Sequence, residues 1–468
     1  MDKVYISLIA GLLLFSSCTE KKYFAGDIAD IEFSEDTIHF DTVFTGIGTT
    51  SRELRVKNPY RSWLMIDRIQ LAGGENSPFR LNIDGKAASA VYDTEIAPGD
   101  SLFIFIDAVI DPNDRNNPVM INDSIEFEIQ SDVLDVNLIA WGQDVRLLNS
   151  VSTGTDIWDD QKPWVIYNSV LVDTGQVLTI NEGARILFHR GSAMYIAGSL
   201  EVKGSNEKPV LFASDRTEEI YSDIPGQWKG IYFLNGSSGN SIHNAKIIQA
   251  VTGIHAGNPE KSGKAPDMEL RNLVISHMSV SGLSSISGSV FAENILISNC
   301  GYHCAFLAGG GEYIFNHCTM ANRWTYSNRA VPSVYISDYY DHNEIRYTGK
   351  LDKAGFYNSV ITGNKTSEVF AVSSGGEQLN IEFVNCLVQD ENPQNYSYEQ
   401  CIFNRDPIFV SWDDYDFRPD TLSPLLDMAS GYYADMVPYD LSGNSRLSDE
   451  GPDIGAYEKQ TGKNDKEN

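Results

Sequence analysis

The sequence predicts an all-β protein in two parts: a β-sandwich over residues 28–148 and a right-handed parallel β-helix over residues 160–458. In the first part, apolar and polar residues alternate in runs separated by turn residues at spacings of roughly 10 to 20 positions. In the second part, shorter apolar runs are broken by Gly, Asn and Asp. Within it, an Asn followed by an apolar run recurs every 22 residues, at Asn272, Asn294 and Asn316.

Composition agrees with a folded, water-facing protein. The chain has 468 residues, 42% of them hydrophobic and 21% charged, which is enough for two or three domains with filled cores. The formal net charge is −29. Such a charge repels a phosphate backbone, so the composition excludes nucleic acid as a partner.

The N-terminus carries an export signal. The apolar stretch VYISLIAGLLLF is too short for a spanning helix of about 20 residues but has the length of a signal-peptide core. The small residues Ser16 and Ser17 before Cys18 resemble the bacterial lipoprotein box. The resemblance implies cleavage before Cys18 and a diacylglycerol on its sulfur, anchoring the chain to a membrane, here the outer membrane of a Bacteroidetes-type cell envelope. A plain signal peptide is the alternative.

Residues 1–18 are therefore predicted to be a signal peptide and residues 19–27 a tether. The strands of residues 28–148 follow, with turns such as Asn58-Pro59 between them. The stretches FDTVFTGIGTTSRELRVKNP, SPFRLNIDG and IAPGDSLFIFI resemble immunoglobulin-like modules of the ASPM/SPD-2/hydin-related group. The resemblance implies a spacer or a partner-binding unit.

The 22-residue interval indicates one coil of a parallel β-helix, in which three short strands and three turns stack on the next coil. Asn at a turn tolerates the left-handed conformation, and stacked amides hydrogen-bond along the column. The predicted structural Asn series is Asn244, Asn272, Asn294, Asn316, Asn358 and Asn385. The first and third residues after each Asn should point inward. The second ones are also mostly apolar, so another segment is expected to cover them.

The stretches LTINEGARILF, GSLEVKGSNEKPVLFAS and GQWKGIYF resemble the right-handed parallel β-helix repeat family. The stretch SPLLDMASGYYADMVPYDLSGNSRLSDEGPDIGAYE resembles the terminus of exported bacterial β-helix proteins. It implies a structural cap, from about residue 420, over the open end of the β-helix. The cap residues are expected to be Asp427, Asp440, Arg446, Asp453 and Glu458, with Arg446 paired to Asp427 or Asp453. Residues 459–468 form a polar tail that is expected to be disordered.

Two clusters interleave acids with aromatic residues. The first holds Asp338, Tyr339, Tyr340, Asp341 and His342, and the second holds Trp412, Asp413, Asp414 and Asp416. Aromatic faces suit sugar rings, and carboxylates suit hydroxyl groups or Ca²⁺. Both clusters are candidate glycan or calcium sites, and solvated loops are the alternative. No other cofactor is expected.

Five cysteines follow Cys18, and their place inside the repeats favours small buried side chains. A zinc site is the alternative for the set Cys300, His303, Cys304, His317 and Cys318. No GxSxG, HExxH, P-loop or dinucleotide motif occurs.

The sequence therefore predicts a cell-envelope lipoprotein, non-catalytic, that presents its β-helix surface to a glycan or an envelope protein. One alternative is a β-helix polysaccharide lyase or glycoside hydrolase. Another is a purely structural component of the envelope.

Overall fold

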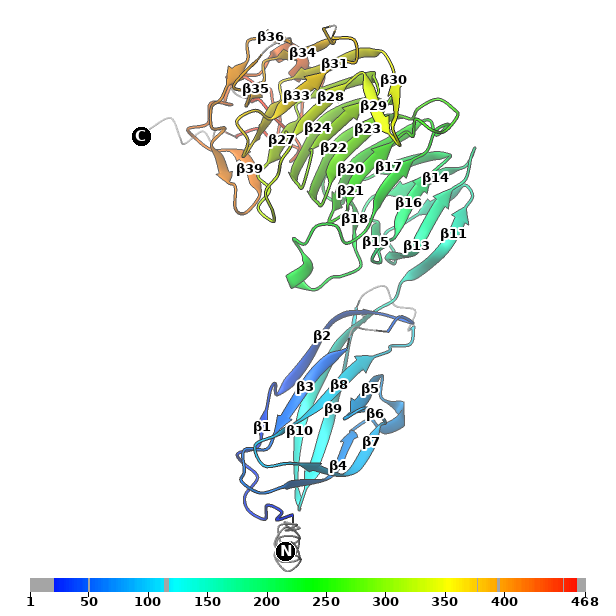
Figure 1. The fold of residues 1–468 in the computed structure, drawn as a ribbon, viewed down its shortest axis with the longest axis vertical. Helices are drawn as coiled ribbons and strands as arrows, with labels where there is room; N and C mark the ends of the chain where they lie inside the picture. The colour runs from blue at the N-terminus through cyan, green and yellow to red at the C-terminus, as the bar shows by residue number, and fades with distance from the viewer. Residues whose placement is uncertain are drawn as a thin grey trace, which may run out of the picture. The chain divides into compact units, whose positions relative to one another are not determined.

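The computed structural model describes residues 21–48, 51–112, 118–376, 378–393, 396–448 and 450–460. The predicted signal peptide, Cys18 and nearly all of the predicted tail lie outside these residues. The chain divides after Asp144 into two compact units, drawn in Figure 1. Among the described residues, no helix has the length and apolar character needed to cross a membrane.

The first unit is an immunoglobulin-like β-sandwich of two five-stranded sheets. One sheet contains, in spatial order, β1 (Glu32–Phe33), β3 (Arg52–Lys57), β8 (Ser101–Ala108), β5 (Phe79–Ile83) and β6 (Lys86–Ala87). The other contains β2 (Thr37–Phe44), β10 (Asp132–Gln143), β9 (Val119–Ile129), β4 (Leu64–Leu71) and β7 (Ala90–Ile96). Alternate residues point into the core, as Leu102, Ile104 and Ile106 of β8 do. This is the pattern that a two-sheet packing requires.

The described part of the predicted tether packs against this sandwich. Tyr23 forms a β-bridge with Trp63, and the ring of Phe24 stacks on Tyr60 with centroids 3.5 Å apart. Two aromatic side chains gain more by covering apolar surface than by staying in water. The chain is therefore held to the sandwich from at least Lys22, whose carbonyl accepts the Trp63 amide.

The second unit is a parallel β-helix whose strands form one continuous 25-stranded sheet (Figure 1). It begins at Arg146, earlier than the residue 160 predicted from the repeats, because β11 pairs in parallel with β13. Its strands are β11 (Arg146–Thr153), β12 (Asp156–Trp158), β13 (Trp164–Val172), β14 (Val177–Asn181), β15 (Arg185–Phe188), β16 (Ala193–Ile196), β17 (Ser199–Lys203), β18 (Val210–Ser214), β19 (Gly230–Phe233), β20 (Asn240–Ile248), β21 (Thr252–Ala256), β22 (Asp267–Met278), β23 (Ser281–Ile286), β24 (Ser289–Cys300), β25 (Ala305–Ala308), β26 (Gly311–Asn316), β27 (Thr319–Asn322), β28 (Val334–Ser337), β31 (Leu351–Tyr357), β32 (Val360–Gly363), β33 (Val369–Val372), β34 (Ile381–Val384), β35 (Leu387–Val388), β36 (Ser397–Glu399) and β37 (Ile402–Phe403).

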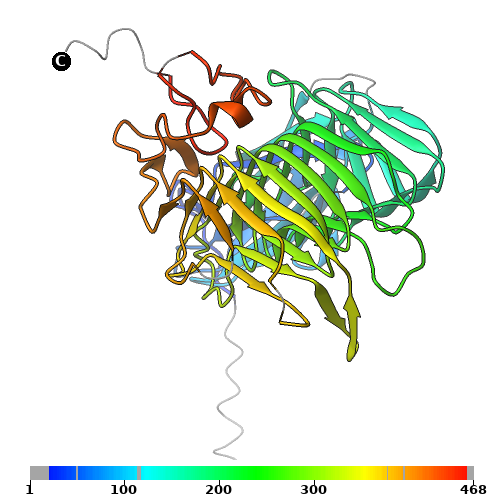
Figure 2. The ribbon, with the colours of Figure 1, turned by 90° about the horizontal axis from the view of Figure 1, so that it is seen from above.

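Few elements lie outside these sheets. Two antiparallel hairpins project from the β-helix: β29 (Tyr339–His342) with β30 (Ile345–Thr348), and β38 (Phe409–Ser411) with β39 (Asp416–Pro419). Figure 2 shows β29–β30 on the side of the solenoid away from the C-terminal segment. The helical turns are η2 (Gly74–Asn76), η3 (Glu219–Tyr221) and α2 (Gly431–Ala434).

The turn column, defined as one left-handed residue from each of six coils, confirms most of the Asn series. Its members have φ between 48° and 56° and are Asn244, Asn272, Asn294, His317, Asn358 and Asn385. The amide of Asn272 donates to Asn244 Oδ1 at 3.1 Å, and that of Asn294 donates to Asn272 Oδ1 at 3.0 Å.

The prediction for Asn316 is wrong. Asn316 ends strand β26 and pairs with Glu293, so the next residue, His317, takes the turn. The imidazole continues the column because His317 Nε2 accepts a hydrogen bond from the Asn358 amide at 2.9 Å, while Nδ1 lies 3.3 Å from the Gly455 carbonyl. Burial and the nearby Arg446 charge hold the pKa of His317 well below its usual value, so the ring is neutral.

The lateral segment, residues 421–460, covers the side of the solenoid and does not lie over its open end. Backbone carbonyls of Met428, Ser430, Tyr433 and Tyr439 accept hydrogen bonds from Asn385, Asn358, Asn316 and Asn294 respectively. The segment therefore runs back along the stack, as Figure 2 shows. The predicted end cap is corrected accordingly.

The apolar second positions explain this placement. Val274, Leu296, Val360 and Leu387 point outward and form a cluster with Leu425 and Ile454 of the lateral segment. Without the lateral segment, this face would expose a row of branched side chains to water. Covering them is favourable by about 25 cal/mol for each Å² of apolar surface buried. The first and third positions after each turn point inward as predicted, for example Ile295 and Ile297.

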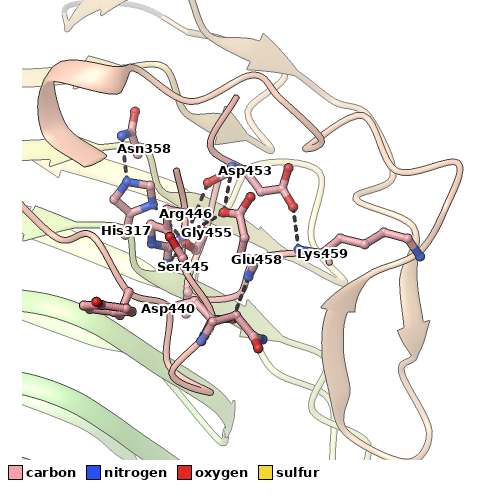
Figure 3. Close-up of polar contacts among 12 residues, drawn as sticks. His317, Asn358, Asp440, Ser445, Arg446, Asp453, Gly455, Glu458 and Lys459 are labelled. Carbon is pink, nitrogen blue, oxygen red and sulfur yellow. Dashed lines mark hydrogen bonds and ion pairs between the residues drawn. The ribbon is translucent and has the colours of Figure 1, made fainter. Parts of the chain in front are cut away.

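A buried guanidinium joins the lateral segment to the turn column (Figure 3). Arg446 is fully buried and forms an ion pair with Glu458 at 3.3 Å. Its Nη2 also donates to Asn294 Oδ1 at 2.8 Å and to the Gly455 carbonyl at 3.1 Å. The predicted partner was the carboxylate of Asp427 or Asp453, but Asp453 offers Arg446 its backbone carbonyl.

The carboxylates of Asp453 and Asp440, two other predicted cap residues, accept hydrogen bonds from backbone amides of the lateral segment. Asp453 accepts the amides of Asp427 and Lys459, and Asp440 accepts those of Ser442, Asn444 and Glu458. These bonds fold the segment onto itself around Arg446.

Replacing Arg446 by Met should lower the free energy of unfolding by about 3–5 kcal/mol, because the fully buried ion pair with Glu458 loses its cation. Urea unfolding of the protein lacking residues 1–18 measures this. Arg418→Met is the matched control: Arg418 pairs with Asp416 on the surface, so its loss should change stability by about 0–1 kcal/mol. Equal effects of the two substitutions would contradict the assignment.

Candidate functional site

The aromatic column is a row of outward-facing rings along one side of the solenoid. Its members are Tyr195, Tyr232, His255, Phe306, Tyr335 and Phe370, from β16, β19, β21, β25, β28 and β33. The strand register places each directly beside the next, except that Ser284 of β23 stands between His255 and Phe306. Seven consecutive coils thus supply six rings.

The rings touch their neighbours along the stack. Centroids lie 5.5 Å apart for Tyr195 and Tyr232, 5.4 Å for Tyr232 and His255, and 5.0 Å for Phe306 and Tyr335. Phe370 follows Tyr335 at 5.9 Å and is 49% exposed. With a coil rise of about 4.8 Å, the six steps span about 29 Å.

Each ring is outward because of the alternation within a short strand. In β16, Met194 and Ile196 are fully buried in the solenoid core, so Tyr195 between them must face outward. Strands β19 and β28 repeat this arrangement around Tyr232 and Tyr335.

Outward positions on another face of this solenoid do not form a row of aromatic residues. The corresponding column on β20, β22, β24, β26, β31, β34 and β36 reads Ser241, Glu269, Phe291, Ile314, Gly355, Glu382 and Ser397. The aromatic column is therefore a specific property of one face.

The first predicted cluster lies beside this column, on hairpin β29–β30. The ring of Tyr340 meets Phe306 edge-on at 6.2 Å. At the tip of the hairpin, the Asn343 amide donates to Glu260 Oε1 at 3.0 Å, and His342 Nε2 lies 3.5 Å from the same oxygen. The hairpin is thus tied to the loop after β21.

The acids of this cluster are already engaged. Arg346 binds both oxygens of Asp341 at 2.7 Å, and these hydrogen bonds lower the pKa of Asp341. Arg346 also lies over the ring of Tyr339. Asp338 accepts hydrogen bonds from Ser373 and Ser374.

The second predicted cluster does not converge. Asp414 accepts a hydrogen bond from Ser411 and Asp416 pairs with Arg418, while Asp413 is exposed. Trp412 lines a cavity of about 700 Å³, whose other lining residues come from outside this cluster. Within the described ranges, no three His, Cys, Asp or Glu side chains lie close enough together to hold a metal ion, which covers both calcium candidates and the zinc alternative.

Another pair of acids, Glu269 and Glu293, lies elsewhere, and Glu293 lines a cavity of about 510 Å³ between the solenoid and the lateral segment. Burial raises the pKa of Glu293. Burial also acts to raise that of Glu269, but hydrogen bonds and charges from Arg271 and His243 bring it below its usual value. However, Arg271 bridges both carboxylates at 2.6 Å. A shared guanidinium thus engages one oxygen of each carboxylate.

Sequence reasoning missed the aromatic column because its members recur at irregular intervals. The step from Tyr232 to His255 is 23 residues, and the step from His255 to Phe306 is 51. The available signal was local: the short apolar runs AMYI, GIYF and SVYIS each carry a Tyr at the position that faces outward.

One buried histidine sits behind the column. His303 lies 5.5 Å from Phe306 and 5.7 Å from Tyr335 between ring centroids, and its Nδ1 donates to the Pro332 carbonyl at 2.7 Å. Burial lowers the pKa of His303 to about 4. The buried site therefore favours the neutral form of the His303 imidazole over the protonated form.

This shift predicts acid sensitivity. Between pH of about 6.5 and 4, unfolded His303 binds a proton that folded His303 does not, so stability is full above 6.5 and falls as pH drops toward 4. The loss should reach about 3 kcal/mol. Urea unfolding at pH 7.5 and 4.5 should show a smaller loss for His303→Gln, which keeps a donor for Pro332. An unchanged loss in that variant would contradict the role given to His303.

Comparisons with known proteins show no family relationship. No family model and no curated protein matches the chain. Similar solved structures include the ASH/PapD-like domain of human CEP192, at 12% identity over 25% of this chain and 87% of that one, TM-score 0.17. They also include the catalytic domain of a GH87 alpha-1,3-glucanase in complex with nigerose, at 10% identity over 76% of this chain and 88% of that one, TM-score 0.22. TM-scores this low do not decide what this chain binds.

Proposed function

We propose that this chain is a cell-envelope lipoprotein that binds a glycan polymer along the aromatic column without cleaving it. The single observation that supports this most is the column itself: six rings from seven successive coils, facing outward on one side of the solenoid.

The argument is physical. An outward aromatic residue leaves apolar surface in water that a buried one would not, and stacking with its neighbours recovers only part of it. A pyranose ring has an apolar face of C–H groups that can lie on such a ring, and its hydroxyl groups stay in water. A row of rings about 29 Å long suits an extended polymer better than a small molecule.

The absence of cleavage is the second element of the proposal. Asp338, Asp341 and the pair Glu269 and Glu293 each have partners within the protein. General acid catalysis needs a carboxyl group free to meet the glycosidic oxygen. These carboxylates are instead ordered by serines or guanidinium groups.

Replacing Tyr335 and Phe370 together by Ala should weaken binding to a responsive polysaccharide at least about tenfold, because two contiguous stacking surfaces are lost. A polysaccharide array on the protein lacking residues 1–18 identifies the ligand, and calorimetry gives the affinities. Phe291→Ala is the control, since Phe291 is 38% exposed on a different column.

The same array is read for released reducing or unsaturated ends. Formation of such products would contradict the non-catalytic part of the proposal and favour a β-helix lyase or hydrolase. Silence in both readouts would leave the structural role as the better explanation.

Attachment to the membrane rests on the residues around Cys18, which lie outside the described part of the chain. In cells, Cys18→Ser should move the protein from the membrane fraction to a soluble one, because the acceptor for diacylglycerol is gone. Fractionation and the mass of the mature N-terminus check this. A serine variant that stays with the membrane would contradict lipid anchoring at this residue.

A further inference from the structure

A second concave site lies on the solenoid, where three strands of one stacked sheet end. The basic cavity has a volume of about 700 Å³, within the range of small-molecule sites. Three cationic side chains line it: Arg323 after β27, Lys365 after β32 and Arg405 after β37. Each directly follows an Asn in the sequence.

These three cations have no ion-pair partner among the residues that the structure describes. The guanidinium carbon of Arg323 lies 5.7 Å from the centroid of the Trp412 ring. This separates them from neighbouring arginines such as Arg329, which is buried and paired with Glu368. In a chain of net charge −29, three unpaired cations around one hollow are a local reversal of sign.

The neutral amides of the cavity are already committed. Asn364 accepts from Arg329 and donates to the Trp324 carbonyl, and Asn404 holds both the amide and the carbonyl of Asp390. Gln389 likewise bonds backbone groups of the neighbouring coil. Apart from two carboxylates, the charged groups that line the cavity are therefore hydrogen-bond donors.

Two acids also line the cavity, and they limit the charge without cancelling it. Asp406 uses one oxygen to accept the Ile408 amide, and Glu391 is exposed. Three cations against two carboxylates leave a formal charge of +1. A ligand with both an anionic group and hydroxyl groups would meet both kinds of side chain.

Trp412 supplies the apolar surface. Its ring is held edge-on between Phe409 at 5.1 Å and Phe417 at 5.6 Å, so its orientation is set by packing. The ring is partly exposed and lines the cavity. A fixed indole next to guanidinium groups can hold a flat apolar face and an oxyanion at the same time.

We propose that the basic cavity binds a sugar unit that carries an oxyanion, either a carboxylate or a sulfate ester. Arg323, Lys365 and Arg405 bind the oxyanion, and Trp412 contacts the sugar ring. The site goes beyond glycan binding at the aromatic column and shares none of its residues.

The experiment is calorimetric titration of the protein lacking residues 1–18 with glucuronate, glucose 6-sulfate, glucose and inorganic sulfate. At least one of the acidic sugars should bind more tightly than both glucose and inorganic sulfate, and added NaCl should weaken that binding. Comparison of glucuronate with glucose 6-sulfate tells which oxyanion the site prefers.

Variants locate the site. The double change Lys365→Ala and Arg405→Ala should weaken the acidic sugar at least about tenfold, since two charge-assisted contacts are lost. Trp412→Ala should weaken the acidic sugar and leave inorganic sulfate unaffected. Arg190→Ala, an exposed arginine on another part of the solenoid, is the matched control and should bind as wild type.

The outcomes are distinct. Acidic sugars that bind no better than glucose, or that bind the double variant equally well, would overturn the proposal. Inorganic sulfate that binds as tightly as both acidic sugars would refute the sugar contact. The double variant that lacks the rings of Tyr335 and Phe370 should still bind the acidic sugar. Loss of binding at the aromatic column can therefore be distinguished from loss of binding at the basic cavity.

Discussion

In-register stacking of one coil on the next is the constraint on which the rest of this structure depends. Parallel pairing sets each residue beside its equivalent in the neighbouring coil, so any side chain type that recurs becomes a column. The turn column, the apolar outward row under the lateral segment and the aromatic column are three results of the same register. The three cations of the basic cavity meet for the same reason, because each follows the end of a stacked strand.

The lateral segment changes what such a stack can do. Coils of a solenoid interact mainly with their nearest neighbours, so their stability is local. Here one segment bonds the coils of Asn385, Asn358, Asn316 and Asn294 in turn. It therefore couples the coil of Asn294 to that of Asn385, whose strands β24 and β34 are joined only through the coils between them. Arg446 is the link: it binds Glu458 and Gly455 of the segment and Asn294 of the turn column with a single guanidinium.

Sequence reasoning worked where a column repeats one residue type and failed where the chemistry is shared by different residues. Asn272 and Asn294 revealed the coil, but the same interval led to Asn316, one residue short of the true turn. His317 could take the turn because its ring nitrogen Nε2 accepts the hydrogen bond that an Asn side-chain oxygen would accept at this position. The aromatic column and the basic cavity combine Tyr, Phe and His, or Arg and Lys, at irregular spacings set by inserted loops. Their assembly depends on loop lengths that a repeat pattern does not encode.

The distribution of satisfied and unsatisfied groups argues for binding over catalysis. Asp338 and Asp341, which sequence patterns single out, are held by serines and a guanidinium group, and Glu269 and the buried Glu293 both pair with Arg271. Rings on one side of the solenoid and cations around Trp412 are among the groups that face outward. Aromatic rings and cations contribute to recognition of apolar faces and anions. This is the basis on which we propose that the surface holds a ligand in place and leaves its bonds intact.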